Sequence, residues 1–97
     1  NIDRAFIRRF QSILYFNLPT IDERIILWEN ALKNFTIAKD VSIKKIAEKY
    51  EVSGASIGNA IQFSWLSSRR DHRNEITELD IEAGLLREMA KEGRAVK

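Results

Sequence analysis

Downstream of position 20, apolar residues recur at intervals of three and four, which is the spacing of one face of an α-helix. The first such stretch opens with Thr20 and has Glu23 three residues later. This is a capping-box pattern, in which each side chain accepts a hydrogen bond from the backbone amide of the other residue. We therefore predict a first helix that begins at Thr20. Its apolar stripe consists of Ile21, Ile25, Trp28, Leu32 and Phe35.

Three further helix starts carry a serine or threonine cap, with one apolar residue directly before the cap and another four residues after it. This arrangement is a hydrophobic staple. We expect the second helix to end near Tyr50 or Glu51, the third to fray around residues 70–72, and small residues of the third to allow close packing of helices. The caps are Ser42, Ser53 and Thr77, and Asp80 occupies the box position after Thr77. The staples are Val41 with Ile46, Val52 with Ile57, and Ile76 with Ile81. The small residues of the third helix are Gly58, Ala60 and Ser64.

The first twenty residues have a different pattern. We predict a short helix over residues 2–7 and a β-strand over residues 12–16, with Arg8 and Arg9 at the helix end between them. A helix end cannot bury two adjacent guanidiniums, so both should point outward. A guanidinium is a planar fork that keeps its charge, which suits it to phosphate oxygens.

This segment resembles the second region of homology of AAA+ ATPases. The resemblance rests on Ile2-Asp3-x-Ala5-Phe6-Ile7-Arg8-Arg9-Phe10, the β-run that ends at Phe16, and Leu18-Pro19 before an acidic helix start. It implies that Arg8 and Arg9 are arginine fingers acting on the ATP of a neighbouring subunit, and it leaves open which of them is the finger. It also implies that Pro19 marks a hinge, within residues 17–20, into a helical lid.

The fold class expected from the resemblance is mostly α: a four-helix AAA+ lid bundle preceded by a short helix and one β-strand from the α/β ATPase core. Residues 1–19 would be the C-terminal end of that core, and residues 20–97 the helical lid subdomain. The implied function is coupling of ATP binding and hydrolysis to protein remodelling. The implied partners are identical subunits, in a hexameric ring, and a protein substrate.

Gly54 and Ala55 stand where many AAA+ proteins place a sensor-2 arginine. Their bare backbone at a helix N-terminus would let a ribose or adenine approach closely, and Ile46 would line the adenine pocket. The alternative is that Gly54 is only a permissive residue in the first helical turn.

Several chemistries are missing from the sequence. It has no G-x-x-x-x-G-K-[ST] phosphate loop and no apolar strand that ends in paired acidic residues. ATP and Mg²⁺ would therefore be bound by an intact parent, while this fragment alone should neither hydrolyse ATP nor bind it tightly. The chain has no cysteine and one histidine, His72, so we expect no metal site. We also expect a cytoplasmic protein without a membrane span, because no apolar run reaches 18 residues.

Two other functions fit parts of the sequence. Residues 43–62 resemble a helix-turn-helix, which would read DNA bases through Ser56, Asn59 and Gln62. The basic residues at 67–73 would either attract phosphates or form a solvated helix end, where the helix dipole favours cations. Against nucleic acid, the net charge is only +2, from 16 basic and 14 acidic residues. A helical protein-interaction module is the second alternative, with Ile26 and Leu27 as its exposed apolar contact.

Overall fold

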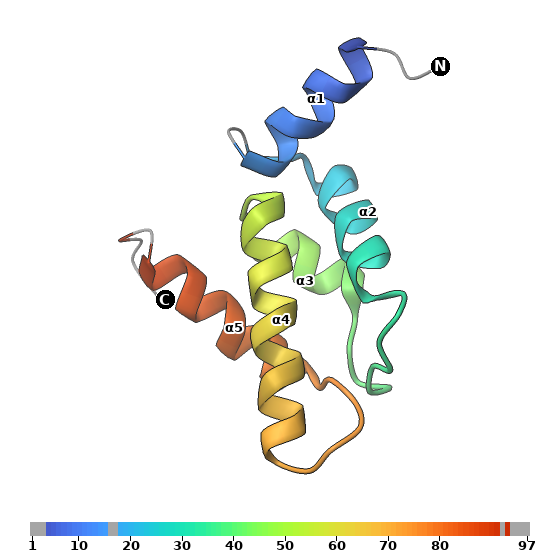
Figure 1. Ribbon diagram of the computed structural model, residues 1–97, viewed down its shortest axis with the longest axis vertical. Helices are drawn as coiled ribbons and strands as arrows, with labels where there is room; N and C mark the ends of the chain where they lie inside the picture. Colours follow the sequence, from blue (N-terminus) through green and yellow to red (C-terminus); the bar gives the residue numbers. More distant parts are fainter. Residues whose placement is uncertain (1–3, 16–17, 92, 94–97) are drawn as a thin grey trace.

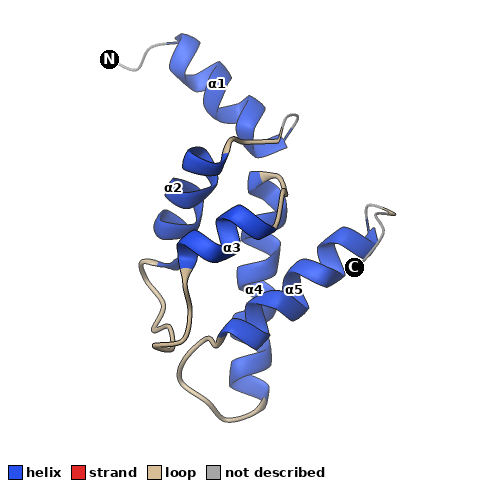
Figure 2. Cartoon of the chain, turned by 180° about the vertical axis from the view of Figure 1, so that it is seen from behind, coloured by secondary structure: helices blue, strands red, loops and turns tan. Residues whose placement is uncertain are grey.

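The structure is a computed structural model that describes residues 4–15, 18–91 and 93. Over these residues it is mostly helical, as expected, and contains no β-strand apart from a single bridge between Ile37 and Ile76 (Figure 2). The helices are α1 (Arg4–Tyr15), α2 (Ile21–Leu32), α3 (Ile43–Lys49), α4 (Gly54–Arg70) and α5 (Glu78–Lys91).

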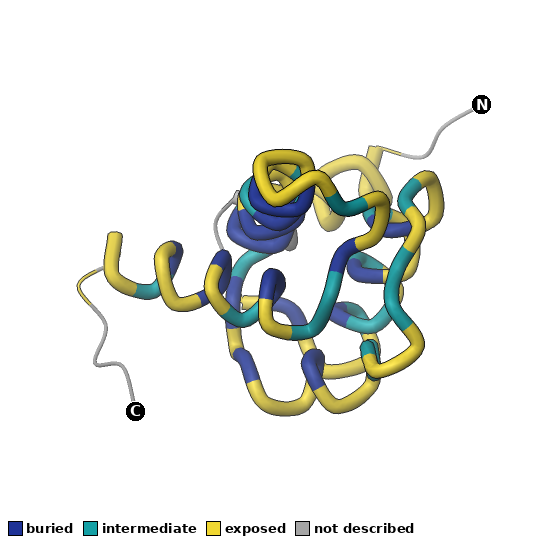
Figure 3. The backbone as a smooth tube through the Cα atoms, turned by 90° about the horizontal axis from the view of Figure 1, so that it is seen from below, coloured by how far each residue is buried: buried dark blue, intermediate teal, exposed yellow. Residues whose placement is uncertain are grey.

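Helices α2 to α5 enclose the core, and α1 lies at one end of the molecule, beyond α2 (Figure 1). The long helix α4 runs through the centre of the bundle, and α5 packs along it. Buried residues line the inward faces of the bundle, as seen along its long axis (Figure 3). The core consists of Trp28, Leu32, Ile46, Ala47, Tyr50, Val52, Ile57, Ala60, Ile61, Ile76, Ile81 and Leu85.

The predicted caps are present. Thr20 Oγ1 accepts from the amide of Glu23 at 3.2 Å, and Glu23 Oε1 accepts from the amide of Thr20 at 2.8 Å. Thr77 and Asp80 form the same reciprocal pair at the start of α5, with distances of 3.2 and 2.9 Å. Ser42 and Ser53 cap α3 and α4 by accepting from the third residue after them. These bonds satisfy amides that a helix start otherwise leaves without a partner.

Helices α4 and α5 approach each other closely at Gly84. A Cβ atom at this position would lie 2.7 Å from the carbonyl oxygen of Ala60, so the contact requires glycine on α5. Ala60 and Ser64 are fully buried, as their predicted role in close packing requires. The predicted role in close packing is wrong for Gly58, because this residue is exposed and has nothing within 4 Å of its Cβ position.

The two long connections of the bundle are tied together by backbone hydrogen bonds. Ala38 donates to the carbonyl of Ile76 at 2.8 Å, and Ile76 donates to the carbonyl of Thr36 at 2.9 Å. Because of this pairing, the buried side chain of Ile76 belongs to the core, just before the start of α5. The loops between α2 and α3 and between α4 and α5 therefore brace each other.

The predicted strand is wrong over residues 12–15, which form the last turn of α1, while Phe16 lies outside the described residues. An isolated strand has no partner for its amides and carbonyls, whereas a helix satisfies them within the same segment. Phe6 and Phe10 also support the helix, because they lie four residues apart and stack with ring centroids 6.4 Å apart. Arg8 and Arg9 therefore lie in the middle of a helix and not at its end.

Candidate functional site

Arg8 and Arg9 both lie on α1, but the structure gives them different surroundings. Arg9 donates from Nη2 to Glu23 Oε2 on α2 at 2.7 Å. Arg8 is exposed and forms no ion pair with any residue that the structure describes. The two guanidiniums are therefore not equivalent: one is engaged at the start of α2 and the other faces solvent.

Glu23 links the Arg9 contact to the capping box of α2. One carboxylate oxygen accepts from the amide of Thr20 and the other from Arg9. The Thr20 amide, with help from Arg9, holds the pKa of the Glu23 carboxyl below its ordinary value. The carboxylate is thus ionised at neutral pH and contributes to both the helix start and the attachment of α1.

An apolar furrow lies between α1 and α2. It is lined by Phe6 and Phe10 from α1 and by Ile26 and Leu27 from α2, with Asn30 and Glu23 at its edge. Phe6, Phe10 and Ile26 are 65%, 47% and 56% exposed. Ile26 is therefore exposed as predicted, whereas Leu27 is half-buried and packs on the core.

Gly54 and Ile46 border different hollows. Gly54 lies in the first turn of α4 and borders a continuation of the furrow, which is lined by Phe10, Leu27, Asn30, Ala31, Lys33, Ile57 and Gly58. Ile46 is buried on α3 and borders a hollow between α3 and α5, lined by Lys45, Lys49, Tyr50, Glu78 and Glu82. Ala55 is half-buried beside Gly54. The residues assigned to adenine are therefore not gathered around one hollow in this structure.

Glu82 dominates the polar contacts of the hollow between α3 and α5. The hydroxyl of Tyr50 donates to Glu82 Oε2 at 2.9 Å, and Lys49 Nζ lies 3.5 Å from the same oxygen. Burial, reinforced by the bond to Glu82, raises the pKa of the Tyr50 hydroxyl. Tyr50 therefore remains protonated and acts as a donor that ties α3 to α5.

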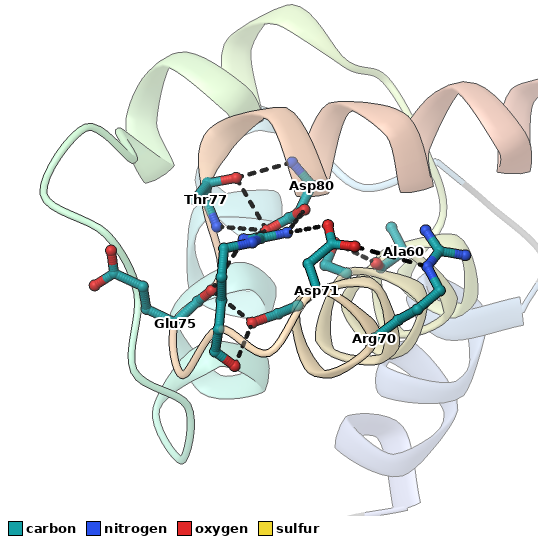
Figure 4. A network of polar contacts seen from close by, with 9 residues as sticks. Ala60, Arg70, Asp71, Glu75, Thr77 and Asp80 are labelled. Carbon is teal, nitrogen blue, oxygen red and sulfur yellow. Dashed lines mark hydrogen bonds and ion pairs between the residues drawn. The ribbon is translucent and has the colours of Figure 1, made fainter.

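The loop that follows α4 is held by a cluster of ion pairs around Arg73. Arg73 forms a two-pronged ion pair with Asp80, with Nη1–Oδ2 and Nη2–Oδ1 distances of 2.8 and 2.9 Å, and its Nη2 also contacts Asp71 at 3.1 Å. Figure 4 shows how these groups converge on the start of α5. Arg70 lies 3.9 Å from Asp71. This cluster closes the loop between α4 and α5 and neutralises Arg73. Arg69 and Arg70 remain exposed, and Arg69, which lies over the Trp65 ring, forms none of the ion pairs between described residues.

The structure also disfavours the helix-turn-helix alternative. Ser56 is buried, so it cannot reach a base edge. Asn59 donates from Nδ2 to the buried carboxylate of Glu88 at 3.0 Å, so its amide is already engaged within the protein and is not free to pair with a base. The described residues contain no group of three metal-ligating side chains. Within the same residues, no helix combines the length and apolar character needed to cross a bilayer.

Sequence reasoning missed one buried polar residue near this site, Arg24. It lies on the inward face of α2, where it donates to Ala47 and Pro19 carbonyls. The available signal was its spacing, because Arg24 is three residues after Ile21 and four before Trp28. The helical period therefore places an arginine on a face otherwise made of apolar side chains.

The chain is similar to curated katanin p60 proteins. It is 38% identical over 71 residues to the A1 form of the katanin p60 ATPase-containing subunit from Strongylocentrotus purpuratus, a match that covers 72% of this chain and 14% of that protein. It is 33% identical over 84 residues to the A-like 1 form from Oryctolagus cuniculus and from Homo sapiens, covering 86% of this chain and 17% of those proteins. The chain therefore spans only about one sixth of the curated relatives it matches.

The fold is similar to part of a solved structure described as the structural basis for katanin self-assembly. The TM-score is 0.64 at 21% identity, and the match covers 87% of this chain and 36% of the solved one. No family model matches the chain. The curated relatives are named as ATPase-containing subunits, which agrees with the AAA+ ATPase resemblance of residues 2–19, and the solved structure shares the fold.

Proposed function

We propose that this chain is the C-terminal part of an AAA+ ATPase related to the katanin p60 proteins, which couples ATP hydrolysis to the remodelling of a protein substrate. The observation that carries the proposal is the 38% identity over 71 residues to a katanin p60 ATPase-containing protein. Residues 20–97 act as the helical lid, and α1 belongs to the preceding part of the ATPase. Identical subunits assemble into a hexameric ring, with ATP and Mg²⁺ bound between neighbours.

Within this proposal, Arg8 is the arginine finger. A finger must extend beyond its own protomer and reach the phosphates of a neighbour, where it neutralises charge that develops on the transferred phosphoryl group. The exposure of Arg8 and the absence of an ion pair to it among the described residues favour this role. Arg9 is held by Glu23 and positions α1 against the start of the lid. An exposed pair of this kind is weak, about 0–1 kcal/mol, so Arg9 also remains able to leave it.

The nucleotide base lies against Gly54 and Ala55 of the lid in this proposal. The hollow beside Gly54 has apolar walls from Phe10, Leu27 and Ile57. Such walls suit the flat face of a nucleobase better than they suit phosphates. Ile46 is 3% exposed and borders the hollow between α3 and α5, so this proposal assigns the base contact to Gly54 and Ala55 alone.

The experiment uses a longer protein that includes the nucleotide-binding residues preceding this chain. We expect Arg8→Ala to leave nucleotide affinity near the wild-type value and to lower turnover by about 10³-fold or more, the range for loss of an arginine finger. Arg9→Ala should lower turnover less. Glu23→Gln, which retains an acceptor for the Thr20 amide but loses the ion pair, should resemble Arg9→Ala.

The turnover of these variants shows whether the two arginines act as fingers and which of them is the finger. Wild-type turnover in the Arg8→Ala, Arg9→Ala double variant would refute the finger proposal as a whole. A larger loss in Arg9→Ala than in Arg8→Ala would reverse the roles of the two arginines. For the base contact, Ala55→Leu should raise the KM for ATP without lowering turnover at saturation, and Ala83→Leu, the same change at an exposed position on α5, is the matched control.

A protein contact is a second function that the apolar furrow favours. Phe6, Phe10 and Ile26 expose large apolar surface side by side, more than scattered single residues would. In the proposed ATPase this surface packs against the rest of the enzyme or a neighbouring protomer. Phe6→Ser and Ile26→Ser should then weaken assembly of the longer protein, measured by light scattering. Unchanged assembly in both variants would remove this role.

A further inference from the structure

Arg24 is a buried guanidinium in the first half of α2. Only 3% of the residue is exposed, and none of the ion pairs among the described residues involves it. A charged group taken out of water must be compensated by hydrogen bonds. Its bonding partners therefore indicate what the residue does.

Both partners are backbone carbonyls from other segments. Arg24 Nε donates to the carbonyl of Ala47 at 2.7 Å, and Nη1 donates to the carbonyl of Pro19 at 2.8 Å. Ala47 lies in the last turn of α3, where carbonyls lack partners within the helix and carry the negative end of its dipole. The planar fork of one arginine thus joins the end of α3 to the residue that precedes the cap of α2.

The chain on the two sides of this contact has different surroundings. Pro19 is buried, whereas the neighbouring Leu18 is 57% exposed. Immediately after Pro19, Thr20 is fixed by its capping box with Glu23, and its carbonyl accepts from the amide of Arg24 at 2.8 Å. Three separate ties therefore attach the backbone at Pro19 and Thr20 to the bundle.

We propose that Arg24 is a positioning residue that fixes Pro19 to α3, so that the rigid body of the helical bundle begins at Pro19. Any change in direction between α1 and the bundle is then taken up before Pro19. Pro19 and Thr20 are therefore excluded from the hinge that is expected within residues 17–20. To bend at Pro19 or Thr20, the chain would have to break a charge-assisted bond and leave a buried guanidinium without its partner.

The functional consequence rests on the proposed ATPase function: Arg24 would make α3 and the adenine side of the lid move together with Pro19 as one unit. The structural claim does not depend on that function. The structural claim can be measured on this chain without nucleotide. A failure of the Arg24 proposal can therefore be distinguished from a failure of the proposed ATPase function.

The test measures a distance distribution between two spin labels by electron paramagnetic resonance. The chain has no cysteine, so Leu18→Cys and Glu48→Cys, both at exposed positions, give unique attachment sites before Pro19 and on α3. The planar peptide and the fixed φ of proline place the Leu18 Cα atom rigidly with respect to Pro19. We expect a narrow distribution in the chain with Arg24 and a clearly broader one in Arg24→Met.

A control pair, Glu29→Cys with Glu48→Cys, joins α2 directly to α3 and should stay narrow in both backgrounds. Arg24→Lys keeps the charge but lacks the fork, so it should also broaden the Leu18 pair. If Arg24→Met also broadens the distance distribution of the control pair because the bundle no longer folds, Arg24→Lys serves as the test variant instead. A Leu18 distribution that is no broader in Arg24→Met or Arg24→Lys than in the chain with Arg24 would overturn the proposal.

Discussion

At the residue scale, Asp80 collects the largest number of polar contacts around the start of α5. It accepts two hydrogen bonds from Arg73 and bonds from both the amide and the hydroxyl of Thr77. The bonds from Arg73, against the opposing effect of burial, lower the pKa of the Asp80 carboxyl from its ordinary 3.8 to about 2. One carboxylate thus caps α5 and closes the preceding loop.

Replacing Asp80 should therefore destabilise the bundle. Asp80→Asn removes the counter-charge of Arg73 and one acceptor for it, and we expect a loss of about 2 kcal/mol in the free energy of unfolding. The measurement is urea unfolding followed by circular dichroism. Asp71→Asn, which removes a 54%-exposed carboxylate from the same arginine, should change the value by less than about 0.5 kcal/mol. Equal effects of the two variants would contradict the central role of Asp80.

The pH dependence follows from the same carboxyl. Because the folded pKa of Asp80 lies below the unfolded value, its stabilisation is present above about pH 4 and is lost as the pH falls towards 2. Urea midpoints should therefore drop between pH 4 and pH 2, and Asp80→Asn should lose part of that drop. A variant curve parallel to that of the unmodified chain over this interval would show that Asp80 does not contribute.

At the element scale, the packing of α4 on α5 depends on contact between their backbones at Gly84. The carbonyl of Ala60 occupies the space that a side chain at Gly84 would need. A helical backbone cannot retreat locally as a flexible side chain can. The distance between the two helices is therefore set by the absence of a Cβ atom on α5.

Two glycine-to-alanine variants test this contact in opposite directions. Gly84→Ala should force the helices apart and cost about 1–3 kcal/mol in unfolding free energy. Gly58→Ala lies in an exposed helix interior with open space around its Cβ position, so it should stabilise by about 0.5–1 kcal/mol. Thermal unfolding of both variants provides the comparison. Stabilisation by Gly84→Ala would mean that the two helices are less tightly apposed than described.

At the scale of the whole molecule, α1 stands outside the core. None of the buried core residues among those described comes from it, and it contacts the bundle through Arg9, through the furrow at Phe10 and on α4. Its residues 4–11 are all exposed. The bundle from Pro19 onward holds the interactions that stabilise folding.

Removal of residues 1–17 should therefore leave a bundle that unfolds cooperatively, with a free energy of unfolding within about 1 kcal/mol of that of the whole chain. Amide exchange in the intact chain should be fastest in α1 among the helices, since its opening exposes little buried surface. Loss of cooperative unfolding on truncation, or protection of α1 equal to that of α4, would contradict this.

Much of the helical architecture could be predicted from the sequence because its signals are local. A cap and its partner lie three residues apart, and a staple spans five, so the starts of α2 to α5 follow from short stretches such as Thr20 with Glu23. The buried stripe of α2 follows in the same way from helical periodicity. For the candidate site, the sequence indicated an exposed Arg8 but could not distinguish it from Arg9.

What only the tertiary structure decided involves partners distant along the chain. The state of residues 12–15 depends on whether another strand is available, and without one the segment completes α1. Arg9 pairs with Glu23, fourteen positions away, and Arg24 with Ala47, twenty-three away. The local sequence pattern predicts on which face of a helix a side chain lies. Which group that side chain contacts depends on how the helices pack against each other. The sequence therefore determined the helices of the bundle, and the packing determined which of its charges are engaged.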